Sequence, residues 1–144
     1  MHNRLKGVTL IELLTVVVII AILASIAVPS YRRYMLRSQR TEATTALLRI
    51  QSGEEKFLVQ NGKYSEKLDS APADGGLGLP TTSEQGLYSL DVKLTATGYT
   101  ATASVVTTKG QKDDTTCQTF TINEAGTRTA LDSGSANRTV ECWR

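Results

Sequence analysis

Residues 7–31 read GVTLIELLTVVVIIAILASIAVPSY, and this stretch determines how the rest of the chain is organised. From Val8 to Val28 it has roughly 21 residues, which as a helix cover about 31 Å, close to the ~30 Å hydrocarbon core of a bilayer. It contains one acidic side chain, that of Glu12. An acid costs about 2.5 to 3.5 kcal/mol at the centre of such a helix and less near its end. We therefore expect a membrane-spanning helix in which Glu12 has a partner.

The apolar stretch differs from an ordinary secretory signal peptide. Such a signal has an apolar segment of about 7 to 15 residues followed by a cleavage site between small residues. Here the apolar stretch is longer and contains an acid, and the small residues Ala24 to Ala27 lead directly into more predicted helix. We expect the helix to be retained. Basic residues flank both of its ends, so the positive-inside rule does not orient it.

Gly7, Val8 and Glu12, followed by the apolar helix and Pro29, resemble the class III signal of type IV pilins and related pseudopilins. The resemblance implies cleavage between Gly7 and Val8 by a prepilin peptidase on the cytoplasmic side, and N-methylation of Val8. It also implies assembly of the mature chain into a filament, in which Glu12 faces the positive N-terminus of a neighbouring subunit. One residue departs from the family pattern, because Val8 stands where the family usually has Phe.

The chemistry of the cleaved N-terminus supports a role for Glu12 in assembly. Cleavage creates an α-amine with a reference pKa of about 7.7 to 8, and an ion pair is weakly screened in an apolar bundle. Glu12 would then select the register between subunits. The alternative is that Glu12 only extends towards the lipid headgroups.

A second helical half is expected from Pro29 to about Gln60. Pro29 lacks a backbone N–H and clashes with the carbonyl of Ser25, so it predicts a kink. After it, apolar or small residues recur at helical spacing and predict a face that packs on a sheet. The residues of this face are Ala43, Ala46, Leu47, Ile50, Phe57 and Leu58. Glu54 and Glu55 are expected on the solvated face of the helix.

The C-terminal part predicts a small antiparallel sheet. Asn61-Gly62 is a helix stop signal, and the following glycines and prolines predict a loop to about Gln85. Alternating patterns predict one hairpin from residues 88–94 and 99–105 and a second from residues 116–122 and 127–131. The expected fold is α+β, a long N-terminal helix packed on a four-stranded antiparallel β-sheet, which is also the pilin fold.

Cys117 and Cys142 are the only cysteines and are 25 positions apart. No carboxylates stand at ligand spacing, so a disulfide is favoured over zinc, and it indicates an oxidising compartment. In pilins the segment between paired C-terminal cysteines is the exposed D-region, which is expected here to be irregular. The final residues, Cys142 to Arg144, look most like minor pilins of the PilE class.

The expected organisation follows the family. It comprises a prepilin leader (1–7), a hydrophobic helix (8–28), its amphipathic half (29–60), an αβ-loop (61–85), an antiparallel sheet (86–131) and a disulfide-bounded D-region (132–144). The resemblance implies a structural subunit of a type IV pilus, expected to be a minor one, serving adhesion, twitching motility or DNA uptake. The chain is expected as a single-pass protein of the inner membrane before assembly and in the surface pilus afterwards.

The partners implied by the resemblance are other pilin subunits, the prepilin peptidase and N-methyltransferase, an inner-membrane assembly platform, and lipid before assembly. No cofactor or metal is expected. A calcium site at Asp113 and Asp114, as in some secretion pseudopilins, lacks an EF-hand pattern, and both residues are expected to be solvated. A type II secretion pseudopilin remains an alternative identity.

Composition argues against an enzyme. The only histidine is His2 in the leader, so the mature chain has no imidazole for a nucleophile system. A DNA-binding minor pilin is the alternative from another class, with a patch formed by Lys109, Lys112, Arg128 and Arg138. Removal of residues 1–7 takes away two basic residues and leaves equal numbers of basic and acidic side chains, which weakens bulk attraction to DNA.

Overall fold

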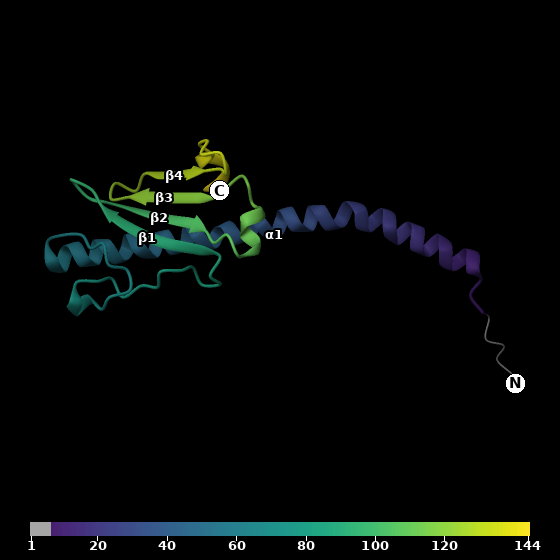
Figure 1. Cartoon of the computed structure of the whole chain (residues 1–144), viewed down its shortest axis with the longest axis horizontal. Helices are drawn as coiled ribbons and strands as arrows, with labels where there is room; N and C mark the ends of the chain where they lie inside the picture. The colour runs from purple at the N-terminus through teal and green to yellow at the C-terminus, as the bar shows by residue number, and fades with distance from the viewer. Residues whose placement is uncertain (1–6) are drawn as a thin grey trace, which may run out of the picture. The chain divides into compact units, whose positions relative to one another are not determined.

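The computed structural model describes residues 7–144. The chain divides into two compact units, Met1–Met35 and Leu36–Arg144, of which the second carries the sheet. Of the expected leader, only Gly7 lies within the described residues. The expected α+β fold is confirmed, because one long helix is followed by a four-stranded antiparallel sheet (Figure 1).

Helix α1 (Leu10–Asn61) has 52 residues and continues through Pro29. Within the second unit it buries Ala43, Leu47, Ile50 and Phe57, whose spacing of three, four or seven residues gives one apolar face. Two other residues of the expected face, Ala46 and Leu58, are only half-buried.

The end of α1 is where the sequence predicts it. Gly62 has φ of +68°, which glycine adopts without strain, and its N–H donates to the carbonyl of Leu58 at 2.8 Å. The side-chain amide of Asn61 donates to the carbonyl of Phe57. These contacts satisfy carbonyls at the end of the helix that have no partner within the helix.

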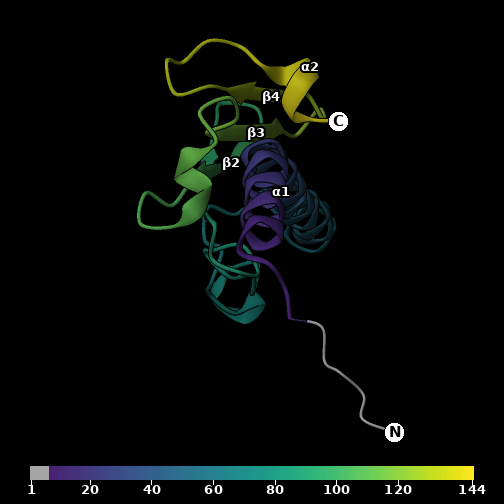
Figure 2. The same cartoon turned by 90° about the vertical axis from the view of Figure 1, so that its right-hand side faces the viewer.

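The sheet is a simple meander of β1 (Tyr88–Leu94), β2 (Tyr99–Val105), β3 (Thr119–Asn123) and β4 (Arg128–Leu131), in the order β1-β2-β3-β4. Tyr88 pairs with Val105, and Phe120 pairs with both Ala103 and Ala130. Burial alternates along β2, as the sequence pattern predicts for a sheet with one face on a core. The sheet and the loop after α1 lie on different sides of the helix (Figure 2).

Three strand boundaries differ from the sequence-based expectation. The third strand begins at Thr119 rather than Thr116 and ends at Asn123 rather than Ile122, and the fourth begins at Arg128 rather than Thr127. Cys117 is in the disulfide and precedes the strand, whereas the backbone of Gln118 still accepts from the N–H of Val105 and donates to the carbonyl of Leu131. Loop residues 106–118 contain a short 3-10 helix, η2 (Gly110–Asp113).

The C-terminal segment is held on β4 by the disulfide. Cys117 and Cys142 are bonded and buried, with their Cα atoms 5.8 Å apart, so the expected disulfide is confirmed. The indole N–H of Trp143 donates to the carbonyl of Thr129, and its ring packs on Phe120 at 6.0 Å between centroids.

The D-region was expected to be wholly irregular, and this expectation was wrong for its last turn. The segment forms a short helix, α2 (Thr139–Cys142). The Thr139 hydroxyl accepts the N–H of Ala130, and the N–H of Arg138 donates to the Ala130 carbonyl. These bonds tie the segment to β4 and allow one helical turn to form in a polar sequence.

We expect the disulfide to make a large contribution to stability. Reducing it should lower the free energy of unfolding of residues 36–144 by about 3 kcal/mol in the chain-entropy model. Urea unfolding with and without reductant measures the effect, and alkylation of the freed thiols prevents re-oxidation. Equal urea midpoints in the two conditions would contradict the expectation.

Candidate functional site

The N-terminal half of α1 is exposed and apolar. Its large side chains between Leu10 and Val28 range from 48% exposed at Val16 to 83% at Leu10. By length and composition α1 is the one candidate membrane span among the described residues. Soluble monomers rarely expose so continuous an apolar surface, so it indicates a surface covered by lipid or by other chains.

Glu12 lies in the first turn of α1, where its backbone N–H donates to the hydroxyl of Thr9 at 3.2 Å. Thr9 and Glu12 have the spacing of a capping box, a signal that our reading of the sequence missed. Within residues 7–144, no hydrogen bond or ion pair engages the Glu12 carboxylate. The carboxylate is therefore available to a partner from outside this part of the chain.

Pro29 lies inside α1 rather than at a break. The Ser25 hydroxyl donates to the carbonyl of Ile22 at 2.7 Å, one turn before the proline. The Arg33 side chain donates to the carbonyl of Pro29 at 3.4 Å. The carbonyl that loses its backbone donor to the proline is that of Ser25, so neither of these hydrogen bonds replaces the missing one.

An ion pair between Arg40 and Asp114 joins α1 to the loop between β2 and β3. The guanidinium binds both carboxylate oxygens, at 2.6 and 2.9 Å. Asp114 is only 3% exposed, so the expectation that it is solvated was wrong, whereas Asp113 is exposed as expected. Since Arg40 occupies both oxygens, Asp114 does not fit the role of a calcium ligand.

Gln111 extends this polar network. Its side-chain amide nitrogen lies 2.9 Å from the Tyr88 hydroxyl, 3.2 Å from Asp114 and 3.2 Å from the carbonyl of Leu36. Gln111 is fully buried, and its Oε1 has no partner within residues 7–144. The network fixes loop residues 106–118 to α1 at residues 36–40. The sequence reading did not identify it, because nothing local distinguishes Asp114 from Asp113.

Glu54 was expected on the solvated face of α1, and this was also wrong, because it is fully buried. One carboxylate oxygen accepts the N–H of Ser65 at 3.0 Å, and the other has no partner within residues 7–144. Burial raises the pKa of Glu54, and the Ser65 N–H partly offsets this rise. The hydroxyl of Tyr99 is also buried without a described partner, and burial together with Glu54 raises its pKa. Glu54 anchors the start of the αβ-loop to the helix.

The raised pKa of Glu54 predicts a pH dependence of stability. Because the pKa of Glu54 is higher in the folded state than its unfolded value near 4.5, the free energy of unfolding is highest below that unfolded value. It falls as the pH rises from there to the folded pKa of Glu54. Glu54→Gln retains the acceptor for Ser65 and carries no charge, so it should remove this dependence and raise the unfolding free energy at pH 7 relative to its value at pH 4. Chemical unfolding from pH 4 to pH 8 measures both effects. The control is Glu55→Gln at the exposed neighbour. If both variants had the same pH dependence of unfolding, the buried charge of Glu54 would not be its source.

The four basic residues named in the sequence analysis have different environments. Lys109 and Lys112 are exposed beside and within η2, on the loop that the Arg40–Asp114 pair fixes. Arg128 stacks on Trp143 at 5.1 Å from the ring centroid, and Arg138 pairs with Asp132 at 3.1 Å. The two lysines share one loop, whereas the two arginines belong to β4 and the D-region.

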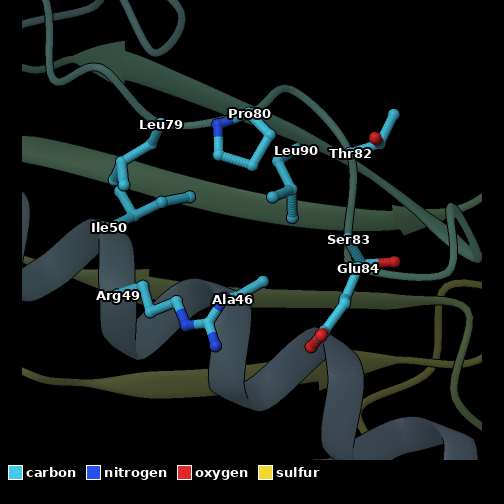
Figure 3. Close-up of a pocket in the computed structure, with 9 residues that line it drawn as sticks. All are labelled: Ala46, Arg49, Ile50, Leu79, Pro80, Thr82, Ser83, Glu84 and Leu90. Atoms are coloured by element: carbon cyan, nitrogen blue, oxygen red, sulfur yellow. The ribbon is translucent and has the colours of Figure 1, made fainter.

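A cavity of about 210 Å³ lies between α1 and the segment leading into β1 (Figure 3). Apolar side chains line most of it, and Arg49 and Glu84 are the charged residues in its lining. The lining consists of Ala46, Arg49, Ile50, Leu79, Pro80, Thr82, Ser83, Glu84 and Leu90. Within residues 7–144, no group of three or more potential ligand side chains is placed to hold a metal ion.

Two family profiles match the sequence of this chain. A family profile described as "Type IV minor pilin ComP, DNA uptake sequence receptor" matches residues 29–121, and one described as "Prokaryotic N-terminal methylation motif" matches residues 2–28.

Relatives named as pilins match a large part of the chain. The type IV major pilin protein PilE1 of Neisseria gonorrhoeae is 35% identical over 102 residues, which are 71% of this chain and 54% of PilE1. The type IV major fimbrial protein FimA of Dichelobacter nodosus is 34% identical over 122 residues, 77% of this chain and 74% of FimA. A solved type IV pilin from Shewanella oneidensis has a TM-score of 0.44 at 21% identity, covering 65% of this chain and 89% of that one. This chain thus spans about half the length of PilE1.

Proposed function

Because the chain belongs to the type IV pilin family, we propose that it is a structural subunit of a type IV pilus, and specifically a minor pilin. The observation that carries the proposal is the exposed apolar half of α1, in which the Glu12 carboxylate has no partner within residues 7–144. Such a surface requires lipid before assembly and neighbouring helices afterwards. Adhesion, twitching motility or DNA uptake is the activity that such a filament serves, and catalysis by this chain is not part of the proposal.

The proposed route of assembly is the one that the match of residues 2–28 to the N-terminal methylation motif implies. A prepilin peptidase on the cytoplasmic side cleaves between Gly7 and Val8, and Val8 is N-methylated. Before assembly the subunit is in the inner membrane with residues 8–28 in lipid, and an assembly platform then transfers it into the filament. There the Glu12 carboxylate pairs with the α-amine of a neighbour, since an ion pair in an apolar bundle is weakly screened.

Intact mass spectrometry tests the proposal. Subunits from sheared surface filaments are compared with those from membranes. Loss of Met1 to Gly7, one added methyl group and two fewer hydrogens for the disulfide are expected in the filament fraction, with low abundance relative to another pilin. Dominance in filaments would instead indicate a major pilin. Absence from filaments with retention in the membrane would favour a type II secretion pseudopilin.

DNA binding is the second candidate function. It is supported by the match of residues 29–121 to a profile whose description names a DNA uptake sequence receptor. The exposed Lys109 and Lys112 on one loop offer a positively charged surface for phosphates. Gel shifts with residues 32–144 across a salt series test it. Salt-sensitive binding that is lost in Lys109→Glu with Lys112→Glu supports the function, and no binding near physiological salt argues against it.

A further inference from the structure

The end of the globular unit at which α1 enters it carries several exposed basic side chains. Lys109 precedes η2 and Lys112 lies within it, and both are exposed. Arg37 is exposed on α1, next to the Leu36 carbonyl that Gln111 contacts. We call Arg37, Lys109 and Lys112 the basic end. Figure 1 shows the loop containing η2 beside α1 at this end of the sheet.

The basic end is held in place by the buried network. The Arg40–Asp114 pair and the contact from Gln111 to Leu36 join the loop to α1 at two points, one helical turn apart. Asp114 therefore contributes no free negative charge. Asp113 is the other acid on the loop, and it takes part in an interaction within the chain. The lysines are thus presented on a fixed loop and not on a mobile one.

In the sequence, the globular unit begins shortly after the predicted membrane span. Only seven residues separate Val28, the last residue of the span, from Leu36, and no acid occurs between Glu12 and Glu42. Between Val28 and Leu36 the chain has Tyr31 and Tyr34, which are 64% and 69% exposed. Exposed tyrosines directly after a span are typical of the headgroup layer of a bilayer. Basic side chains within that layer attract anionic lipids.

We propose that the basic end binds the anionic phospholipid headgroups of the leaflet at which the span of the unassembled subunit ends. This inference rests on the proposed function, because it requires residues 8–28 to be inserted in a membrane. The bound headgroups hold the globular unit at the membrane surface until the subunit is transferred. Release of these contacts is then part of the step that takes the subunit into the filament.

Hydrogen exchange on the full chain in lipid nanodiscs tests the proposal. One set of discs contains phosphatidylcholine alone, and the other also contains phosphatidylglycerol. We expect amides of residues 107–113 to exchange more slowly in the anionic discs, by roughly fivefold for each contacting lysine, and to lose this protection at high salt. Lys109→Glu with Lys112→Glu should abolish it. The matched control, Lys63→Glu with Lys67→Glu, reverses two lysines that are exposed on the loop after α1 and should retain it.

The outcomes separate this proposal from the function on which it rests. If residues 107–113 exchange at the same rate in both sets of discs while residues 10–28 are protected, the chain is inserted but the headgroup contact is overturned. Exchange of residues 10–28 as fast as in an unfolded peptide overturns membrane insertion and the contact together. If added duplex DNA slows the exchange of residues 107–113 and phosphatidylglycerol does not, the basic end binds nucleic acid, and the proposal is also overturned.

Discussion

Glu12→Ala is expected to leave membrane insertion intact and to lower incorporation into filaments by at least about 30-fold. Removing one partner of a buried, hydrogen-bonded charge pair costs about 2 to 5 kcal/mol, mostly because the other charge is left unpaired. In the assembly that we propose, that other charge is the α-amine of a neighbour. In lipid the same substitution removes an acid from an apolar helix, so insertion is not weakened. Quantitative mass spectrometry of sheared filaments and of membranes measures the two quantities.

Two further variants identify which property of Glu12 matters. Glu12→Gln keeps the shape and polarity of the side chain and removes only the charge, so it should resemble Glu12→Ala. Thr9→Ala removes the hydroxyl that caps the Glu12 N–H and should have a small effect on incorporation. If Thr9→Ala lowers incorporation as strongly as Glu12→Ala, helix capping explains the effect. Normal incorporation of both Glu12 variants would remove the proposed ion pair.

Arg40→Ala is expected to lower the unfolding free energy of residues 36–144 by about 3 to 5 kcal/mol. The substitution leaves the carboxylate of Asp114 buried without its cation, which is the costly way to break a buried ion pair. The loss should appear in chemical unfolding as a lower midpoint. Arg37→Ala is the control, since that residue is exposed on the same helix three positions earlier, and it should change the midpoint little.

A double variant distinguishes the ion pair from simple packing. Arg40→Met with Asp114→Leu removes both charges and retains apolar volume, so it should recover much of the stability lost in Arg40→Ala. Because these residues fix loop 106–118, Arg40→Ala should also speed hydrogen exchange in that loop. A double variant no more stable than Arg40→Ala would mean that the ion pair is not the source of the loss.

The two buried acids show where reasoning from the sequence fails. Glu54 and Asp114 each have an acidic neighbour in the sequence, Glu55 and Asp113, and each pair was expected to be solvated. The structure buries one member of each pair, because burial depends on what packs against the residue from elsewhere in the chain. For Asp114 that element is α1, 74 positions away, and for Glu54 it is the segment at Ser65. Neither contact can be predicted from the residues that neighbour Glu54 or Asp114 in the sequence.

The sequence alone determined the features that depend on local periodicity, length and turn chemistry. These are the apolar helix with Glu12, its end at Asn61-Gly62, two hairpins with one buried face, and the disulfide between the only two cysteines. Tertiary structure alone decided the Arg40–Asp114–Gln111 network, the buried state of Glu54 and the helical turn at Thr139–Cys142. The physical reason is that a period or a turn is a property of neighbouring residues, whereas pairing a buried polar group requires a partner that only the folded chain brings within hydrogen-bonding distance.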